Sequence, residues 1–147
     1  MWYLQRPYGD LPDIESLAVI ADGIYEHQKV AGRSRKMPWY IQLTSKASLL
    51  IPSLFNPRTE TFAILTRDGN NLFRTIHNDG PNKNRMPLFL PTEQALEWID
   101  PDLSDKHKQE LMAFEITSSQ LKAHTVYSIR GKLSRPDGKE ANKAHEW

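Results

Sequence analysis

The apolar runs of this chain are short, and turn-forming residues close each of them. Runs rich in β-branched and aromatic residues are found at Leu17–Ala21, Trp39–Leu43, Leu49–Phe55 and Thr61–Leu65. A membrane span needs about 18 consecutive apolar residues, far more than any of these runs provides. The pattern therefore predicts several short β-strands, with Val126–Ile129 as a closing strand near the end of the chain.

Two helices are expected after these strands. Pro91-Thr92-Glu93 is typical of a helix start, and this first helix should end before Asp100-Pro101. Ser104 is a suitable N-cap for a second helix over Asp105–Phe114. Strands interspersed with short helices indicate an α+β fold, built mainly on an antiparallel sheet with a barrel-like core.

Two polar stretches are expected to lie outside these elements. Arg67-Asp68-Gly69-Asn70 is typical of a turn, and residues 134–147 are polar enough to form a flexible tail. The length of 147 residues suits a single domain. No charged region followed by an apolar segment opens the chain, so no signal peptide is expected and we place the protein in the cytoplasm.

The composition excludes several classes of site. The chain has no cysteine, which rules out a disulfide scaffold, a thiolate zinc site and a cysteine nucleophile within these residues. The formal net charge of +1 gives no overall bias, but charge is unevenly distributed. Residues 23–90 carry 10 Lys and Arg against 4 Asp and Glu, whereas residues 91–115 carry 2 against 7. This zoning predicts a basic face and a separate acidic helical region, or simply an ordinary solvated surface.

Glu26 is the first candidate for chemistry. It lies in an alternating segment after Asp22-Gly23, between aromatic and apolar neighbours that would partly desolvate its carboxylate and suit it to proton transfer. His77 is the second, because an imidazole at the end of an apolar stretch can act as a general acid or base near neutral pH. The alternatives are an exposed strand carboxylate and a surface histidine before the loop 78–84.

Aromatic residues alternate with basic ones in a pattern typical of single-stranded nucleic acid binding, in which rings stack on bases and cations neutralise phosphates. The predicted DNA contacts are Arg35, Lys36, Trp39, Arg74 and Arg85. The alternative is that Trp39, Tyr40 and Phe73 are core residues of strands. The other histidines, His107, His124 and His145, have no metal-ligand spacing, so neither a metal nor a cofactor is expected.

Taken together and in order, these segments resemble the SOS response-associated peptidase (SRAP) family of abasic-site processing proteins. Its A-D-G-[FY]-[FY]-E motif corresponds to Ala21–Glu26, and its I-H-x-R-M-P motif to Ile76-His77 and Arg85-Met86-Pro87 with a loop inserted. Further similar stretches are Pro38-Trp39-Tyr40-Ile41, Phe62–Thr66 with Gly69-Asn70, and Trp98-Ile99 with the helix that follows. The resemblance extends over about residues 17–130.

The resemblance implies an activity. Family members bind single-stranded DNA and react with the aldehyde of an abasic site through an N-terminal cysteine, which becomes exposed when the initiator Met is removed. The α-amine of this cysteine forms a Schiff base, and its thiol closes a thiazolidine ring. Glu26 matches the family's catalytic glutamate and His77 its catalytic histidine. The implied function is therefore peptidase- or lyase-type processing of abasic sites in the DNA-damage response, with nucleoid association when DNA is bound.

The sequence also departs from the family pattern. The chain opens Met1-Trp2-Tyr3-Leu4 where the family has Met-Cys-Gly-Arg, and no N-A-R-x-E-T segment precedes Ala21. His27 stands where many members have Trp. We therefore expect an N-terminally truncated SRAP-like domain that lacks the nucleophile. The alternatives are a non-catalytic single-stranded DNA-binding remnant and an inactive fragment with an unpaired sheet edge.

Overall fold

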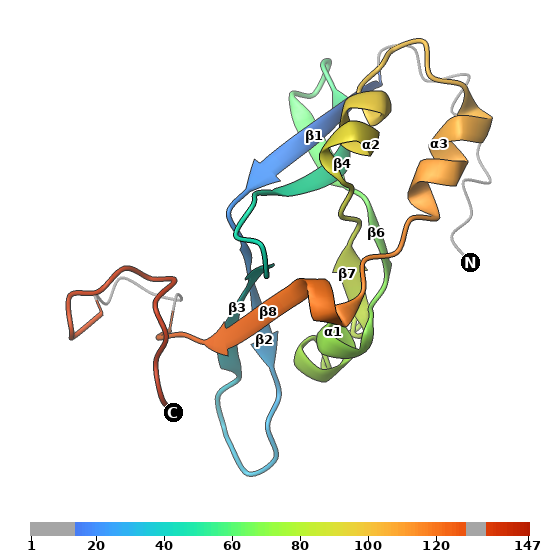
Figure 1. Ribbon diagram of the computed structural model, residues 1–147. Coiled ribbons are helices and arrows are strands. Elements are labelled where there is room, and N and C mark those ends of the chain that lie inside the picture. Colours follow the sequence, from blue (N-terminus) through green and yellow to red (C-terminus); the bar gives the residue numbers. More distant parts are fainter. Residues whose placement is uncertain (1–13, 129–134) are drawn as a thin grey trace. The chain divides into compact units, whose positions relative to one another are not determined.

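The strands of this chain are divided between separate sheets that belong to two compact units (Figure 1). The computed structural model describes residues 14–128 and 135–147. Within them, the first unit comprises residues 14–21, 49–67 and 87–116, and the second comprises residues 22–48, 68–86, 117–128 and 135–147. No helix in the described ranges is long and apolar enough to cross a membrane.

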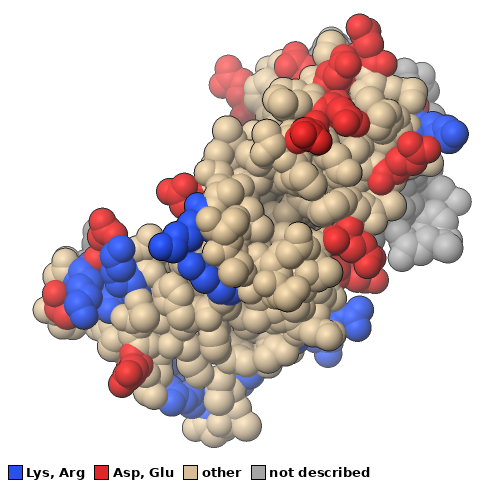
Figure 2. Space-filling model, in the orientation of Figure 1, with Lys and Arg blue, Asp and Glu red and all other residues tan. Residues whose placement is uncertain are grey.

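The two units differ in charge. Counted over described residues, the first unit has 4 Lys and Arg against 9 Asp and Glu, and the second has 12 against 7. We therefore call them the acidic unit and the basic unit. On the face shown in Figure 2, acidic side chains gather over the unit that contains the two longest helices, in agreement with the zoning seen in the sequence.

The acidic unit packs two helices with a three-stranded antiparallel sheet. The strand order is β1 (Glu15–Ala21), β4 (Leu49–Asn56) and β5 (Thr61–Ile64), and the helices are α2 (Thr92–Trp98) and α3 (Asp105–Met112). Its buried core consists of Leu88, Leu90, Ala95, Trp98 and Leu111. Both α2 and α3 contribute to this core, because each has an apolar side facing inward.

Specific polar contacts fix the helices of the acidic unit. The indole N–H of Trp98 donates to the main-chain oxygens of Leu17 at 3.1 Å and Ser53 at 3.3 Å, which fastens α2 to β1 and β4. The Ser104 hydroxyl accepts from the amide of His107 at 3.3 Å, so the predicted N-cap of α3 is confirmed. At the other end of α3, the Arg67 guanidinium donates to the Phe114 carbonyl oxygen.

The basic unit has a second three-stranded antiparallel sheet, in the order β2 (Ile24–Gln28), β3 (Met37–Leu43) and β8 (Leu121–Thr125). The helix α1 (Asn71–Ile76) and the 3₁₀ turn η2 (Ser118–Gln120) belong to the same unit. The fully buried apolar residues of the unit include Ile41, Phe73, Ile76 and Val126. Two short strands, β6 (Thr66–Asp68) and β7 (Arg85–Pro87), form a two-stranded sheet.

The α+β class and the mainly antiparallel sheets are confirmed, but the described strands form open sheets and do not close into a barrel. The expected turn at 67–70 is wrong, since Thr66–Asp68 is a strand and Asn70 caps α1. The closing strand is Leu121–Thr125, so the predicted strand at Val126–Ile129 is wrong, and Val126 forms an isolated bridge with Ala144 just beyond it. Lys122 and His124 are polar and lie on one face of this strand, so the strand does not appear as an apolar run in the sequence. Ile129 lies outside the described residues.

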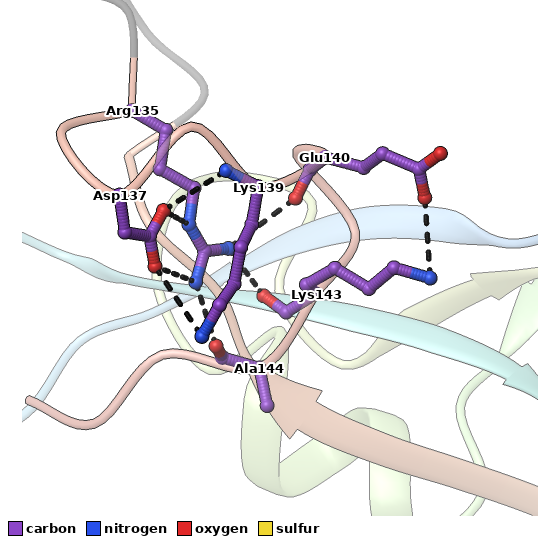
Figure 3. Close-up of polar contacts among 6 residues, drawn as sticks. All are labelled: Arg135, Asp137, Lys139, Glu140, Lys143 and Ala144. Carbon is purple, nitrogen blue, oxygen red and sulfur yellow. Dashed lines mark hydrogen bonds and ion pairs between the residues drawn. The ribbon is translucent and has the colours of Figure 1, made fainter.

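The segment 135–147, for which we expected flexibility, is organised around Arg135 (Figure 3). Its guanidinium donates to both carboxylate oxygens of Asp137, at 2.6 and 3.0 Å, and to the carbonyl oxygens of Glu140, Lys143 and Ala144. The indole of Trp147 donates to the Val126 oxygen at 2.8 Å, which fastens the segment to the chain beyond β8. Flexibility concerns motion and stays a prediction; Ser134 lies outside the described residues.

Candidate functional site

Glu26 occupies the middle of β2, directly after the turn at Asp22-Gly23. A side chain at position 23 would collide with β3, because an added Cβ would lie 2.4 Å from Cζ of Tyr40 and 2.7 Å from the Ile41 oxygen. Glycine therefore lets β2 start against β3 without displacing Tyr40. In the register that follows, Glu26 lies opposite Trp39 on the same face of the sheet.

His77 ends α1 (Asn71–Ile76), a helix that was not expected from the sequence. The side chain of Asn70 accepts from the amide of Phe73 at 3.2 Å and caps the start of the helix, while the His77 amide closes its end on the Phe73 oxygen at 2.7 Å. The signal for the helix was present, since an Asn N-cap is followed by apolar Phe73 and Ile76 three residues apart.

The structure brings Glu26 and His77 together. Oε2 of Glu26 lies 4.0 Å from Nδ1 of His77, and both side chains are about three-quarters buried, with exposed fractions of 26% and 22%. The other carboxylate oxygen accepts from the His27 amide at 2.9 Å, which restrains the Glu26 side chain. A carboxylate and an imidazole from distant parts of the sequence therefore converge on one partly desolvated region.

The contact of His77 with the main chain determines the tautomer of its ring. Nδ1 lies 2.9 Å from the Arg85 carbonyl oxygen, and because a carbonyl can only accept, Nδ1 carries the proton. In the neutral ring, Nε2 is then the basic nitrogen. The main-chain oxygen of His77 also accepts from the Asn84 amide at 2.7 Å. This hydrogen bond closes the loop 78–84 at its base, between His77 and the start of β7.

Gln28 links the elements that carry the two candidate residues, although no motif in the sequence points to it. Its Oε1 accepts from the Trp39 indole at 3.0 Å and its Nε2 donates to the Thr75 oxygen at 3.1 Å, which joins β2 to β3 and to α1. Gln28 lies on the same face of β2 as Glu26. Its amide thus fixes the distance between the strand of Glu26 and the helix that ends at His77.

The predicted DNA-contact residues all belong to the basic unit. Arg35 is exposed in the β2–β3 hairpin, and the neighbouring Lys36 ion-pairs with Asp79 at 2.8 Å. Trp39 is half-buried and its indole N–H donates to Gln28. The exposed Arg74 donates from Nε to the Gly69 oxygen at 2.7 Å. Arg85 is half-buried at the start of β7. Their contact with DNA stays a prediction.

The other histidines make different contacts. His107 ion-pairs with Glu97 at 2.8 Å between α3 and α2, and Nε2 of His124 lies 2.7 Å from the Asn142 oxygen. His145 meets the rings of Tyr127 and Trp147 edge-on. In the part of the chain that the structure describes, no three His, Asp or Glu side chains gather closely enough to hold a metal ion.

Solved structures share the fold. A protein from Bacteroides thetaiotaomicron is 23% identical with a TM-score of 0.65, over 95% of this chain and 59% of that one. A phage-related protein from Bordetella bronchiseptica is 27% identical with a TM-score of 0.61, over 78% of this chain and 54% of that one. Another protein from the same organism is 21% identical with a TM-score of 0.60, over 78% and 56% respectively. This chain therefore spans little more than half the length of these structures.

A family model provides the assignment that the geometry alone does not. No curated protein matches the chain significantly. The model described as SOS response associated peptidase (SRAP) matches residues 13–132, a range that includes both Glu26 and His77. Because this match covers most of the 147 residues, the resemblance seen in the sequence motifs is confirmed, and the chain belongs to the SOS response-associated peptidase (SRAP) family.

Proposed function

We propose that this chain processes abasic sites in single-stranded DNA during the SOS response. In this proposal the basic unit binds the strand, and Glu26 and His77 transfer protons at the abasic aldehyde. The observation that carries it is the 4.0 Å approach of the Glu26 carboxylate to the His77 imidazole, on elements joined by Gln28. Membership of the SRAP family supports the same activity, which would place the protein in the cytoplasm and, when bound to DNA, at the nucleoid.

The chemistry of an abasic aldehyde requires both kinds of group. An amine adds to the carbonyl carbon, and water must then leave for an imine to form, which needs a proton at the departing oxygen. A thiol next adds to the imine carbon, and this step needs the thiol proton removed. With its Nδ1 proton donated to the Arg85 oxygen, His77 presents Nε2 as an acceptor, while the Glu26 carboxylate, 4.0 Å from Nδ1, provides a second proton carrier.

The nucleophile must come from elsewhere, because the 147 residues contain no cysteine. We therefore expect that this chain alone forms no thiazolidine crosslink with abasic single-stranded DNA. On a denaturing gel after heating, the DNA should migrate as free strand. A heat-stable covalent adduct formed by the chain would contradict this expectation.

The proton-transfer roles are tested by providing the missing nucleophile in solution. Free cysteine contains both the amine and the thiol, so the chain should accelerate its conversion of an abasic oligonucleotide to the thiazolidine, measured by mass spectrometry. Because general acid–base groups contribute about 10²–10⁴-fold to rates, Glu26→Gln or His77→Ala should remove most of this acceleration.

The acidic unit offers a matched control. Glu97→Gln and His107→Ala alter a Glu–His pair of the same chemistry, 2.8 Å apart, in the other unit. These two variants should keep the acceleration seen with the unaltered chain. Equal rates for Glu26→Gln and the unaltered chain would overturn the assignment of Glu26.

A second candidate function is single-stranded DNA binding without chemistry, and the excess of basic residues in the basic unit favours it. Binding of this kind weakens steeply with added salt, because cations on the protein replace counterions on the phosphates. Glu26→Gln should leave such binding intact. Salt-dependent binding with no acceleration of the cysteine reaction would favour this second function over the first.

A further inference from the structure

The loop 78–84 separates His77 from Arg85 by seven residues, whereas one residue separates them in the family motif I-H-x-R-M-P. The loop carries Asp79, whose carboxylate lies 2.8 Å from the ammonium group of Lys36. Lys36 stands at the end of the β2–β3 hairpin loop and is one of the predicted DNA contacts. One of the cations proposed to bind phosphate is thus already paired with a carboxylate of this chain.

Other contacts hold the same loop against the hairpin. The Asn78 side chain accepts from the Lys29 amide at 2.8 Å and donates to the Lys29 oxygen at 3.0 Å. These two hydrogen bonds hold Asn78, the neighbour of Asp79, against Lys29, which directly follows β2. The hydrogen bond from Lys36 lowers the pKa of Asp79, with a smaller contribution from Lys29, which shows that both cations favour the charged carboxylate.

The Lys36–Asp79 pair is open to exchange with a ligand. The two side chains are 36% and 47% exposed, so solvent and an incoming anion can reach both. Exposed ion pairs contribute little to stability, because water screens the charges and two long side chains lose freedom. A phosphodiester carries one negative charge and two terminal oxygens, so it can accept the same charge-assisted hydrogen bond from Lys36 as the carboxylate does.

We propose that Asp79 competes with a DNA phosphodiester for Lys36, so that the loop beside His77 sets the affinity for single-stranded DNA. This inference rests on the proposed function, and it identifies a residue that determines affinity outside the Glu26–His77 pair. Binding of the strand moves Lys36 from Asp79 to phosphate. The competition reduces affinity for any strand, whatever its sequence, because phosphates are common to all of them.

The inference is tested by fluorescence anisotropy with a labelled single-stranded oligonucleotide over a range of salt concentrations. Asp79→Asn should tighten binding about two- to fivefold at low salt, the effect expected of one exposed ion pair. It should also steepen the plot of log affinity against log salt by up to about 0.7, the value for one further phosphate contact on a single strand. Lys36→Gln should weaken binding and flatten the same plot.

Two comparisons separate direct competition from a general change in charge. Asp22→Asn removes the same charge from another exposed aspartate of the basic unit, and its effect should be smaller than that of Asp79→Asn. In the Lys36→Gln background, the effect of Asp79→Asn should fall to that of Asp22→Asn, because the cation for which Asp79 competes is gone and only the general change in charge remains.

The outcomes distinguish this inference from the proposed function. Binding that is equally tight in Asp79→Asn and Asp22→Asn overturns the competition and leaves DNA binding intact. An undiminished effect of Asp79→Asn in the Lys36→Gln background overturns it as well. The absence of binding by the unaltered chain and by every variant overturns the proposed function itself.

Discussion

The acidic unit and the basic unit both contain a three-stranded antiparallel sheet, but the side chains that join their elements differ. In the acidic unit, leucines and one tryptophan form a core between the sheet and α2 and α3. In the basic unit, side-chain amides cross from one element to another, with Gln28 between β2, β3 and α1 and Asn78 at the end of β2. Apolar packing contributes to both units, and in the basic unit a network of side-chain amides also positions the candidate site.

Each unit also contains a Glu–His pair, and the comparison shows that proximity alone does not identify a site. Glu97 and His107 are only 2.8 Å apart, but both are nearly half exposed and join two neighbouring helices. Glu26 and His77 are 4.0 Å apart and less exposed, and the ring of His77 is oriented by a main-chain carbonyl. Partial burial and a fixed ring orientation suit side chains to proton transfer, so these two features favour Glu26 and His77 as the candidate site.

The largest effect is expected from Trp98→Ala in the acidic unit. Trp98 is 2% exposed and its indole N–H bonds two strands, so its removal creates a cavity and leaves two oxygens without their donor. We expect a loss of about 3–5 kcal/mol in the free energy of unfolding, measured by urea denaturation. Leu96→Ala is the control on the same helix, because Leu96 is 61% exposed and should change stability by less than about 0.5 kcal/mol. Similar losses in both variants would contradict a core centred on Trp98.

The fold could be predicted from the sequence where short-range patterns determine it. The strands at Leu49–Asn56 and Met37–Leu43 begin and end within two residues of the predicted limits. Short runs of β-branched and aromatic residues between turn residues favour strands over helices, which explains the agreement. The Ser104 cap of α3 was found for a similar reason, since a hydroxyl before a helical stretch satisfies a free amide.

The elements that were missed depend on long-range contacts. In Leu121–Thr125 only Leu121 is buried and the other four residues are half-buried, so the strand is recognisable only once β3 lies beside it. The candidate site also depends partly on long-range contacts. Glu26 and His77 were singled out from their local sequence and from family motifs, whereas Gln28 and Asp79 contact partners 47 and 43 positions away along the chain, which no local pattern reveals.

An intermediate effect is expected when the polar network of the basic unit is cut. Gln28→Leu keeps a side chain of similar size but removes the hydrogen bonds to the Trp39 indole and the Thr75 oxygen. We expect a loss of about 1–3 kcal/mol in the free energy of unfolding, smaller than that for Trp98→Ala. Gln42→Leu, at another half-buried position of the same sheet, serves as the control. If the two leucine variants were equally stable, packing and not the amide network would hold this unit together.

The smallest effect on stability is expected from contacts within the segment 135–147. The titration of Asp137 tests whether this segment is an ordered part of the basic unit. The hydrogen bonds from Arg135 hold the pKa of Asp137 at about 2, below its ordinary value of 3.8. A lowered pKa means that the contact stabilises the folded state above pH 4 and is lost as the pH falls from about 4 to about 2. Carboxyl ¹³C NMR should show Asp137 titrating near pH 2 in the unaltered chain and near its ordinary value in Arg135→Ala. An Asp137 that titrates near 3.8 in the unaltered chain would mean that the Arg135 contacts do not persist in solution, and the basic unit would then end at β8.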